Sequence, residues 1–215
     1  MGPDPYLYLL IITIGVSLWG FRSASFFDRY SFSISGVARR QWWRFVTSAF
    51  LHVGTWHLLV NGLTLYFFAP TVTPYFKGLL FIGLYLISLL IGNLTTFLLY
   101  AKQPHYTAVG ASGAVAGIVF SSLLVNPGIE LYILPIPIPI PGPFFGGAYL
   151  LYSLYGIFKN NDRIGHAAHF GGSIGGVLYT LAFYPYLFTN NAKVWILLFV
   201  VLLALMLLIR RQFRR

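Results

Sequence analysis

The chain has 215 residues, of which 58% are hydrophobic and only 8% are charged. Because an ordinary soluble domain carries about 25% charged residues, this composition excludes a cytosolic enzyme, a nucleic-acid-binding domain and a disordered protein. The net charge of +10 comes from Lys and Arg that stand mostly between or after apolar runs, where lipid headgroups would meet them. There is no Cys, which excludes disulfides and thiolate chemistry. We predict an all-α polytopic membrane protein.

The first half of the sequence predicts three membrane helices and one interfacial segment. An apolar run at residues 6–20 is not followed by a small-residue cleavage site, which favours a retained helix over a signal peptide. Residues 21–50 mix five Arg with Phe, Trp and Ser, a pattern typical of a segment lying at the membrane interface. A second helix is predicted at residues 51–69, ended by Pro70, and a third at residues 76–100.

The second half predicts four more helices, at residues 109–125, 144–158, 166–183 and 193–209. Alternate prolines at residues 134–141 forbid a helix and favour a stiff, extended linker. The seventh helix contains no Gly, Ser or His, so we expect it to face lipid at the periphery. We therefore predict a six-helix core at residues 1–187 and an extra helix with a basic tail at residues 188–215.

Polar residues in the second helix are candidate functional groups, because polar side chains inside a bilayer are costly. His57 and Asn61 are four residues apart, so both side chains lie on one helix face. His52 stands five before His57 and is expected to point elsewhere. The structural alternative is that His57 and Asn61 hold helices together by interhelical hydrogen bonds.

Small residues in the fourth and sixth helices predict a close helix contact. Ser112 and Gly113 belong to a run of small residues at the start of the fourth helix, and Gly172 and Gly176 form a GxxxG face on the sixth. His169 projects from that same face and would reach Ser112 if the two helices pack together. Glycines beside Ser112 would also let a substrate backbone approach it and leave backbone N–H groups open.

A Ser–His pair with two further side-chain donors predicts acyl transfer, since a base within hydrogen-bond reach is enough to activate a serine. His166, one turn before His169, is expected to face the loop and water. These two His have a workable spacing for a metal, but a site needs three or four ligands. A proton-coupled transporter would want an intramembrane carboxylate, and none of the four acidic residues lies in a predicted span: Asp4, Asp28, Glu130 and Asp162. We predict no metal and no cofactor.

Four sequence motifs in order resemble those of the rhomboid family of intramembrane serine proteases. Residues 52–61 resemble the H-x4-H-x3-N pattern of the second helix, and residues 110–113 resemble the G-x-S-G nucleophile motif. Residues 168–176 resemble the A-H-x2-G-x3-G pattern of the sixth helix. Trp43 and Arg44 resemble the W-R motif of the first loop. The resemblance extends over essentially the whole predicted six-helix core.

This resemblance implies a fold, a reaction and a set of roles. It implies a six-helix core with one added C-terminal helix. Ser112 would be the nucleophile and His169 the general base, while His57, Asn61 and the Ser112 N–H would stabilise the oxyanion. Trp43, Arg44, Gly113, Gly172 and Gly176 would be structural.

The resemblance also implies partners, which are transmembrane segments of other membrane proteins, and a lipid surround, without nucleic acid. A substrate segment would enter sideways and be cut where its helix unwinds. The alternative is a catalytically silent rhomboid-like protein that binds or escorts membrane segments.

The sequence departs from the family pattern in two places. The family often has an aromatic residue four positions after the serine, which can stack on the histidine, and here that residue is Ala116. The family's second loop often carries a Glu that can meet the first-loop Arg, but residues 69–74 contain no acid. The residues alone therefore leave the support of His169 and the partner of Arg44 open.

Membrane orientation is predicted differently by charge and by resemblance. All but two of the 14 Lys and Arg, namely Lys77 and Lys193, fall on the side of loops one, three and five and the C-terminal tail. The positive-inside rule would place that side in the cytoplasm. The resemblance places loop one and the opening of the site outside. We follow the resemblance and expect a multi-pass protein of the cell membrane whose site opens to the extracytoplasmic side.

Overall fold

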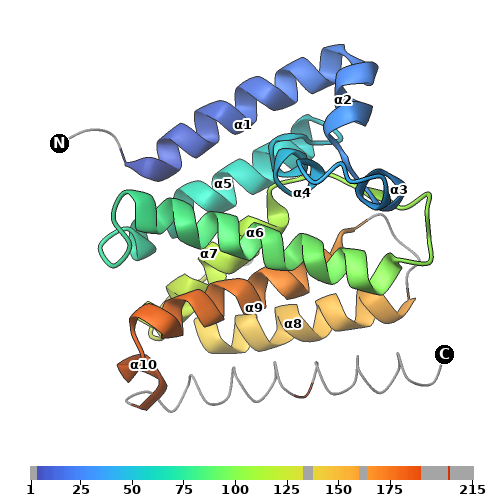
Figure 1. The fold of residues 1–215 in the computed structure, drawn as a ribbon. Helices are drawn as coiled ribbons and strands as arrows, with labels where there is room; N and C mark the ends of the chain where they lie inside the picture. Colours follow the sequence, from blue (N-terminus) through green and yellow to red (C-terminus); the bar gives the residue numbers. More distant parts are fainter. Residues whose placement is uncertain (1–3, 133–137, 160–163, 190–202, 204–215) are drawn as a thin grey trace.

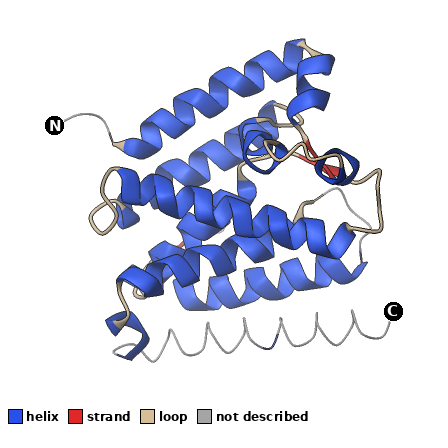
Figure 2. Cartoon of the chain, in the orientation of Figure 1, coloured by secondary structure: helices blue, strands red, loops and turns tan. Residues whose placement is uncertain are grey.

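The structure, a computed structural model, describes residues 4–132, 138–159 and 164–189 together with residue 203. This part of the chain is built almost entirely of helices, with two very short antiparallel strand pairs (Figure 2). In chain order the elements are α1 (Pro5–Arg22), α2 (Ala24–Tyr30), β1 (Phe32–Ser33), α3 (Ile34–Ala38), α4 (Arg44–Thr47), the 3-10 helix η1 (Ser48–Phe50), α5 (Thr55–Val72), α6 (Leu79–Tyr100), β2 (Thr107–Ala108), α7 (Ser112–Val125), β3 (Glu130–Leu131), β4 (Ile140–Pro141), α8 (Gly142–Lys159), α9 (His166–Phe183) and α10 (Tyr186–Thr189). The predicted all-α fold is confirmed.

The long helices differ in how apolar they are. Among the described residues, α1 and α6 are long and apolar enough to cross a bilayer, and α7 is apolar but shorter. Helices α5, α8 and α9 have 18 residues each, but Gly, Tyr, Thr and His interrupt their apolar runs. Residues of all three helices line a shared cavity, which fits their less uniformly apolar sequences.

Helix α7 lies at the centre of the molecule (Figure 1). Every residue from Gly113 to Val125 is buried, and the helix packs mainly against α5, α6 and α9. Its 14 residues span only about 21 Å at 1.5 Å per residue, against a hydrocarbon thickness of about 30 Å. A helix this short cannot reach both membrane surfaces.

Backbone-to-backbone packing joins α7 to α9. A Cβ atom added at Gly172 would overlap the backbone of Gly113, and one added at Gly176 would overlap the backbone of Gly117. Helix α9 makes its most extensive contacts with α6 and α7. The small-residue faces of the two helices therefore lie directly against each other, and no larger side chain fits between them.

The first loop is a folded unit. Residues 21–50 form α2, β1, α3, α4 and η1, and Arg44 at their centre is only 8% exposed. Its guanidinium donates to Gln41 Oε1 and to backbone carbonyl oxygens of the same loop, those of Asp28 and Ser31. The second loop is thus not needed to hold Arg44. Trp43, just before it, is 45% exposed.

Some predicted helix ends are wrong by a few residues. Helix α5 begins at Thr55 rather than at residue 51 and continues through Pro70 to Val72. Pro70 lies in the last turn, where a missing N–H removes only one helical hydrogen bond. Helix α6 begins at Leu79, after Gly78 with its φ of 54°. Helix α7 begins at Ser112 rather than at residue 109, because the preceding backbone has another conformation that is described below.

Parts of the predicted C-terminal half lie outside the described residues. Residues 133–137, which include the first half of the proline linker, are one such part, and the end of the linker forms β4, which pairs with β3 just upstream of the linker. The predicted seventh helix at residues 193–209 also falls outside, apart from residue 203. The division at residue 187 stays a prediction, and the structure adds the unexpected short helix α10 across it.

Candidate active site

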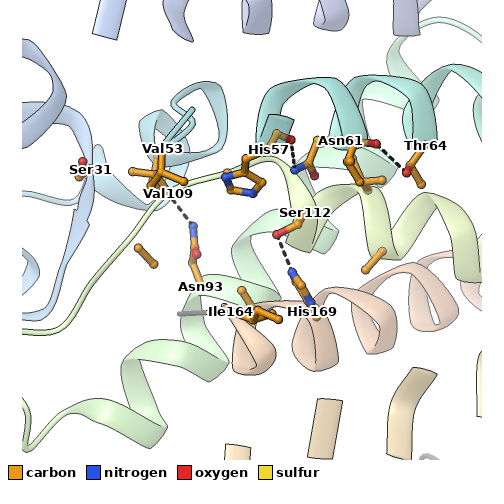
Figure 3. Close-up of a pocket in the computed structure, with 18 of the residues that line it drawn as sticks. Ser31, Val53, His57, Asn61, Thr64, Asn93, Val109, Ser112, Ile164 and His169 are labelled. Atoms are coloured by element: carbon orange, nitrogen blue, oxygen red, sulfur yellow. Dashed lines mark hydrogen bonds between the residues drawn. The ribbon is translucent and has the colours of Figure 1, made fainter. Parts of the chain in front are cut away.

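Ser112 and His169 come together from two helices. Ser112 is the first residue of α7 and His169 belongs to the first turn of α9. The Ser112 Oγ and His169 Nε2 atoms lie 2.7 Å apart, within hydrogen-bond distance, and Figure 3 shows the two side chains pointing at each other. A serine hydroxyl in contact with an imidazole nitrogen is the arrangement that lets the imidazole accept the hydroxyl proton.

The glycine contact between α7 and α9 determines this distance. His169 stands three residues before Gly172, whose Cα lies against the Gly113 backbone, and Gly113 follows Ser112 directly. A Cβ added at Gly113 would stand 3.2 Å from the Ala168 carbonyl oxygen. The two functional side chains therefore start from backbone segments that touch, and both need only normal side-chain lengths to meet.

A non-helical segment leads into Ser112 and is held by the first loop. Gly110 has a φ of 125°, a conformation that residues with a Cβ rarely adopt, and a Cβ there would stand 2.7 Å from the His57 ring. The Gly110 N–H donates to the Ser48 carbonyl oxygen at 2.9 Å. Strand β2 just upstream pairs with β1 of the first loop. Irregular backbone at membrane depth is stable only where protein groups satisfy it, and the first loop supplies those groups.

His52 completes the support of this segment, although sequence reasoning assigned it no role. The Ala111 N–H donates to His52 Nε2 at 3.4 Å, and His52 Nδ1 lies 2.9 Å from Ser17 Oγ. Since Nε2 accepts, Nδ1 carries the proton, and Ser17 Oγ in turn donates to the Phe50 carbonyl oxygen at 2.8 Å. The ring lies in the loop before α5 and is fully buried. Burial lowers the pKa of His52 to about 3, and the nearby His57 adds to this effect.

His57 and Asn61 line the same cavity as Ser112 and His169 (Figure 3). Asn61 Nδ2 donates to the His57 carbonyl oxygen of its own helix at 3.0 Å, and its second amide hydrogen stays available. Within the described part of the chain, His57 Nδ1 is buried without a hydrogen-bond partner. His52 does not line the cavity, yet its ring packs edge-on against that of His57, with centroids 4.8 Å apart.

The cavity has a volume of about 910 Å³ and is lined by α5, α6, α7, α8, α9, the segment before Ser112 and parts of the first loop. No described residue of its lining is an Asp or a Glu. Likewise, no three His, Asp or Glu of the described ranges gather as a metal site would require. The imidazoles of the lining are those of His57 and His169, and its other polar side chains are hydroxyls, Ser112 among them, and the amides of Asn61 and Asn93.

An aromatic ring of α8 lies beside His169. The Tyr149 ring is stacked with the His169 ring, at a centroid distance of 6.0 Å and an interplanar angle of 23°. Ala116 also lines the cavity but offers no ring. Nothing in the sequence singles out Tyr149, because α8 carries several Tyr at similar spacing and only the tertiary packing shows which one meets the histidine.

His166 is buried, contrary to the expectation that it faces water. Only 2% of its surface is exposed, and Tyr152 of α8 packs edge-on against its ring at a centroid distance of 5.0 Å. The ring fits because residue 156 is glycine, where a Cβ would overlap it. His166 does not line the cavity, but its ring packs edge-on against that of His169, with centroids 6.3 Å apart.

The fold and the site together define a polytopic helical membrane protein with a serine–histidine pair in a cavity within its helical core. Comparison with known families matches residues 39–186 to the Rhomboid domain. The chain belongs to the rhomboid family.

Similar proteins come from bacteria and mitochondria. The chain is 31% identical to "Putative rhomboid protease YdcA" of Bacillus subtilis over 146 residues, which cover 66% of this chain and 68% of that protein. It is 33% identical to "Rhomboid protein 1, mitochondrial" of Saccharomyces cerevisiae over 62% of this chain and 40% of that protein. It is 27% identical to "RHOMBOID-like protein 12, mitochondrial" of Arabidopsis thaliana over 79% of this chain and 55% of that protein. The matches thus span about half the length of the two mitochondrial relatives.

Proposed function

We propose that this chain is an intramembrane serine endopeptidase that cleaves transmembrane segments with a Ser112–His169 dyad. The observation that carries the proposal is the 2.7 Å contact between Ser112 Oγ and His169 Nε2 at the wall of a cavity of about 910 Å³. Membership of a family that includes a relative named as a rhomboid protease supports the reaction class.

The first chemical step is attack by the serine. Ser112 Oγ forms a bond to the scissile carbonyl carbon while His169 Nε2 accepts its proton, so this nitrogen is unprotonated in the resting enzyme. The tetrahedral intermediate then collapses, the C–N bond breaks, and His169 returns the proton to the leaving amine. A water molecule repeats the sequence on the acyl-enzyme, with His169 again as the base, and releases the second product.

We expect three donors to stabilise the negative charge of the intermediate. Ser112 is the first residue of α7, so its N–H has no acceptor within the helix. His57 and the second Asn61 amide hydrogen belong to the neighbouring wall of the cavity. Donors that are fixed before the reaction stabilise an oxyanion without the cost of reorienting solvent.

The walls of the cavity suit an apolar, extended chain. Helix α5 packs on α1 and α7, whereas α8 packs on α9 and α7, and Figure 1 shows α5 and α8 well apart. Apolar side chains of α5, α7 and α8 line the space between them, namely Val60, Phe68, Val115, Val119 and Phe145. Entry between α5 and α8 would bring a membrane segment to Ser112 without passage through water.

The decisive experiment is cleavage of a labelled transmembrane substrate by purified protein in lipid. We expect Ser112→Ala to abolish cleavage and labelling by a fluorophosphonate probe, and His169→Ala to lower turnover about as much, because paired groups act as a unit. Ser122→Ala is the matched control, since this serine lies on the same helix but bonds to the Val119 carbonyl oxygen, away from the cavity. Cleavage by Ser112→Ala at the wild-type rate would disprove the proposal, and binding without cleavage by the wild type would favour the escort function.

We also propose that the site opens to the extracytoplasmic side of the cell membrane. A tag inserted between Lys159 and Gly165, in the loop before α9, should then be accessible from outside intact cells. Accessibility only after permeabilisation would instead support the orientation predicted by the positive-inside rule.

A further inference from the structure

We propose that Tyr149 of α8 is a positioning residue that holds the His169 ring in line with Ser112. The inference rests on the proposed serine protease function. It starts from the near-parallel arrangement of the two rings, whose planes differ by 23°. Stacked rings at such separations attract each other, and a neighbouring face also limits rotation of the imidazole about its side-chain bonds.

Two rings lie beside His169 in addition to its hydrogen bond with Ser112. The His166 ring is edge-on to it, with centroids 6.3 Å apart and planes at 70°, whereas the Tyr149 ring lies nearly parallel to the imidazole. The side chain of Ala116, on the same helix as Ser112, carries no ring that could lie there.

Tyr149 is itself held firmly enough to serve as a support. Its ring contacts Phe120 of α7, with centroids 6.0 Å apart, and stacks with Phe145 one turn earlier on α8 at 6.1 Å. Phe120 is completely buried. The row Phe120–Tyr149–His169 therefore runs from the central helix through α8 to the proposed base.

This arrangement divides the control of the dyad between two helices. The glycine contact of α9 with α7 determines how far His169 is from Ser112, whereas α8 determines how the ring is turned. If the stacking ring were on α7, the contact between α7 and α9 would determine both the distance from Ser112 to His169 and the orientation of the His169 ring. With Tyr149 on α8, the orientation of the base depends on where α8 lies.

The test compares variants that keep or remove the ring face. Tyr149→Phe keeps the face and should retain kcat within about threefold of wild type, while Tyr149→Leu and Tyr149→Met fill the space without a face and should lower kcat by about 10- to 100-fold, the scale of a misoriented catalytic group. KM should change by less than about threefold, because binding does not require the base. Tyr155→Leu is the control, since Tyr155 is exposed on the same helix and contacts Lys159 rather than either histidine.

A spectroscopic measurement keeps this inference separate from the proposed function. In protein with 13C-labelled histidine, the His169 ring resonance should be shifted by the ring current of residue 149 in the wild type and in Tyr149→Phe, and that shift should disappear in the Leu and Met variants. Wild-type kcat in the Leu and Met variants, an effect on KM alone, or equal losses in Phe and Leu would each overturn the positioning role. Retained cleavage by Ser112→Ala would instead overturn the protease function and the inference with it, whatever the resonance shows.

Discussion

Helices α9 and α8 flank the proposed dyad, but they are packed by different means. Helix α9 meets α7 backbone to backbone at Gly172 and Gly176. Helix α8 meets its neighbours through rings, chiefly Tyr149, which contacts Phe120 and His169. Touching backbones leave no room for adjustment, whereas rings can rotate or slide. The comparison shows that a fixed distance and an adjustable orientation can be built into one site from two kinds of packing.

The largest effect should come from adding one methyl group to the backbone contact. Gly172→Ala places a Cβ in the Gly113 backbone, and we expect a loss of stability of about 3 kcal/mol or more, at the upper end of overpacking costs, together with loss of cleavage. Thermal unfolding and turnover in lipid measure both. The control is Gly15→Ala on α1, where a Cβ meets nothing within 4 Å and should be neutral or stabilising. An unchanged melting temperature for Gly172→Ala would show that the two backbones do not touch.

The second-largest effect should come from replacing the proposed oxyanion donors on α5. These variants test whether α5, which flanks neither side of the α8–α9 comparison, stabilises the transition state. His57→Ala and Asn61→Ala should each lower kcat by about 100- to 1,000-fold, while KM moves less because these bonds strengthen mainly during reaction. Leu63→Ala, on the same helix but 45% exposed and outside the cavity lining, should leave kcat unchanged. If both variants instead melted early and the folded fraction kept normal kcat, the two residues would serve only to hold the helices.

The same Gly-to-Ala substitution can be made on α8, the helix that packs through rings. Gly156→Ala places a Cβ against the His166 ring, a side chain rather than a backbone, so we expect a stability loss of about 1–3 kcal/mol, smaller than that of Gly172→Ala. Thermal unfolding of both variants under one condition makes the comparison. Equal losses would mean that α8 is packed as rigidly as α9.

We expect a smaller effect of pH on the free energy of unfolding, which arises from protonation of His52. Burial lowers the pKa of this ring to about 3 from its ordinary value of 6.5, so the unfolded chain takes up the proton first. This contribution to stability is complete above pH 6.5 and falls by about 1.4 kcal/mol per unit as the pH drops toward 3. Unfolding measured between pH 7 and pH 5 should show a shallower slope in His52→Gln. Identical slopes in wild type and His52→Gln would refute this assignment.

Local patterns were sufficient for the main outline of this protein. Helix α9 begins and ends as predicted, at His166 and Phe183, because a glycine precedes it and Tyr184–Pro185 ends it. The family motifs pointed to Ser112 and His169, which the fold brings within 2.7 Å of each other. Such features can be read from the sequence because helix periodicity, small-residue spacing and motif order are properties of neighbouring positions.

Other features were decided only by the tertiary structure. Arg44 bonds to its own loop rather than to a second-loop acid, His52 supports the Ala111 N–H, and Tyr149 supplies the ring that Ala116 lacks. Each of these contacts joins side chains or backbone groups whose relative position depends on how the chain segments pack. The sequence by itself determined the helices, the family and the candidate pair; the packing decided what surrounds that pair, because a contact between distant segments leaves no periodic trace in either of them.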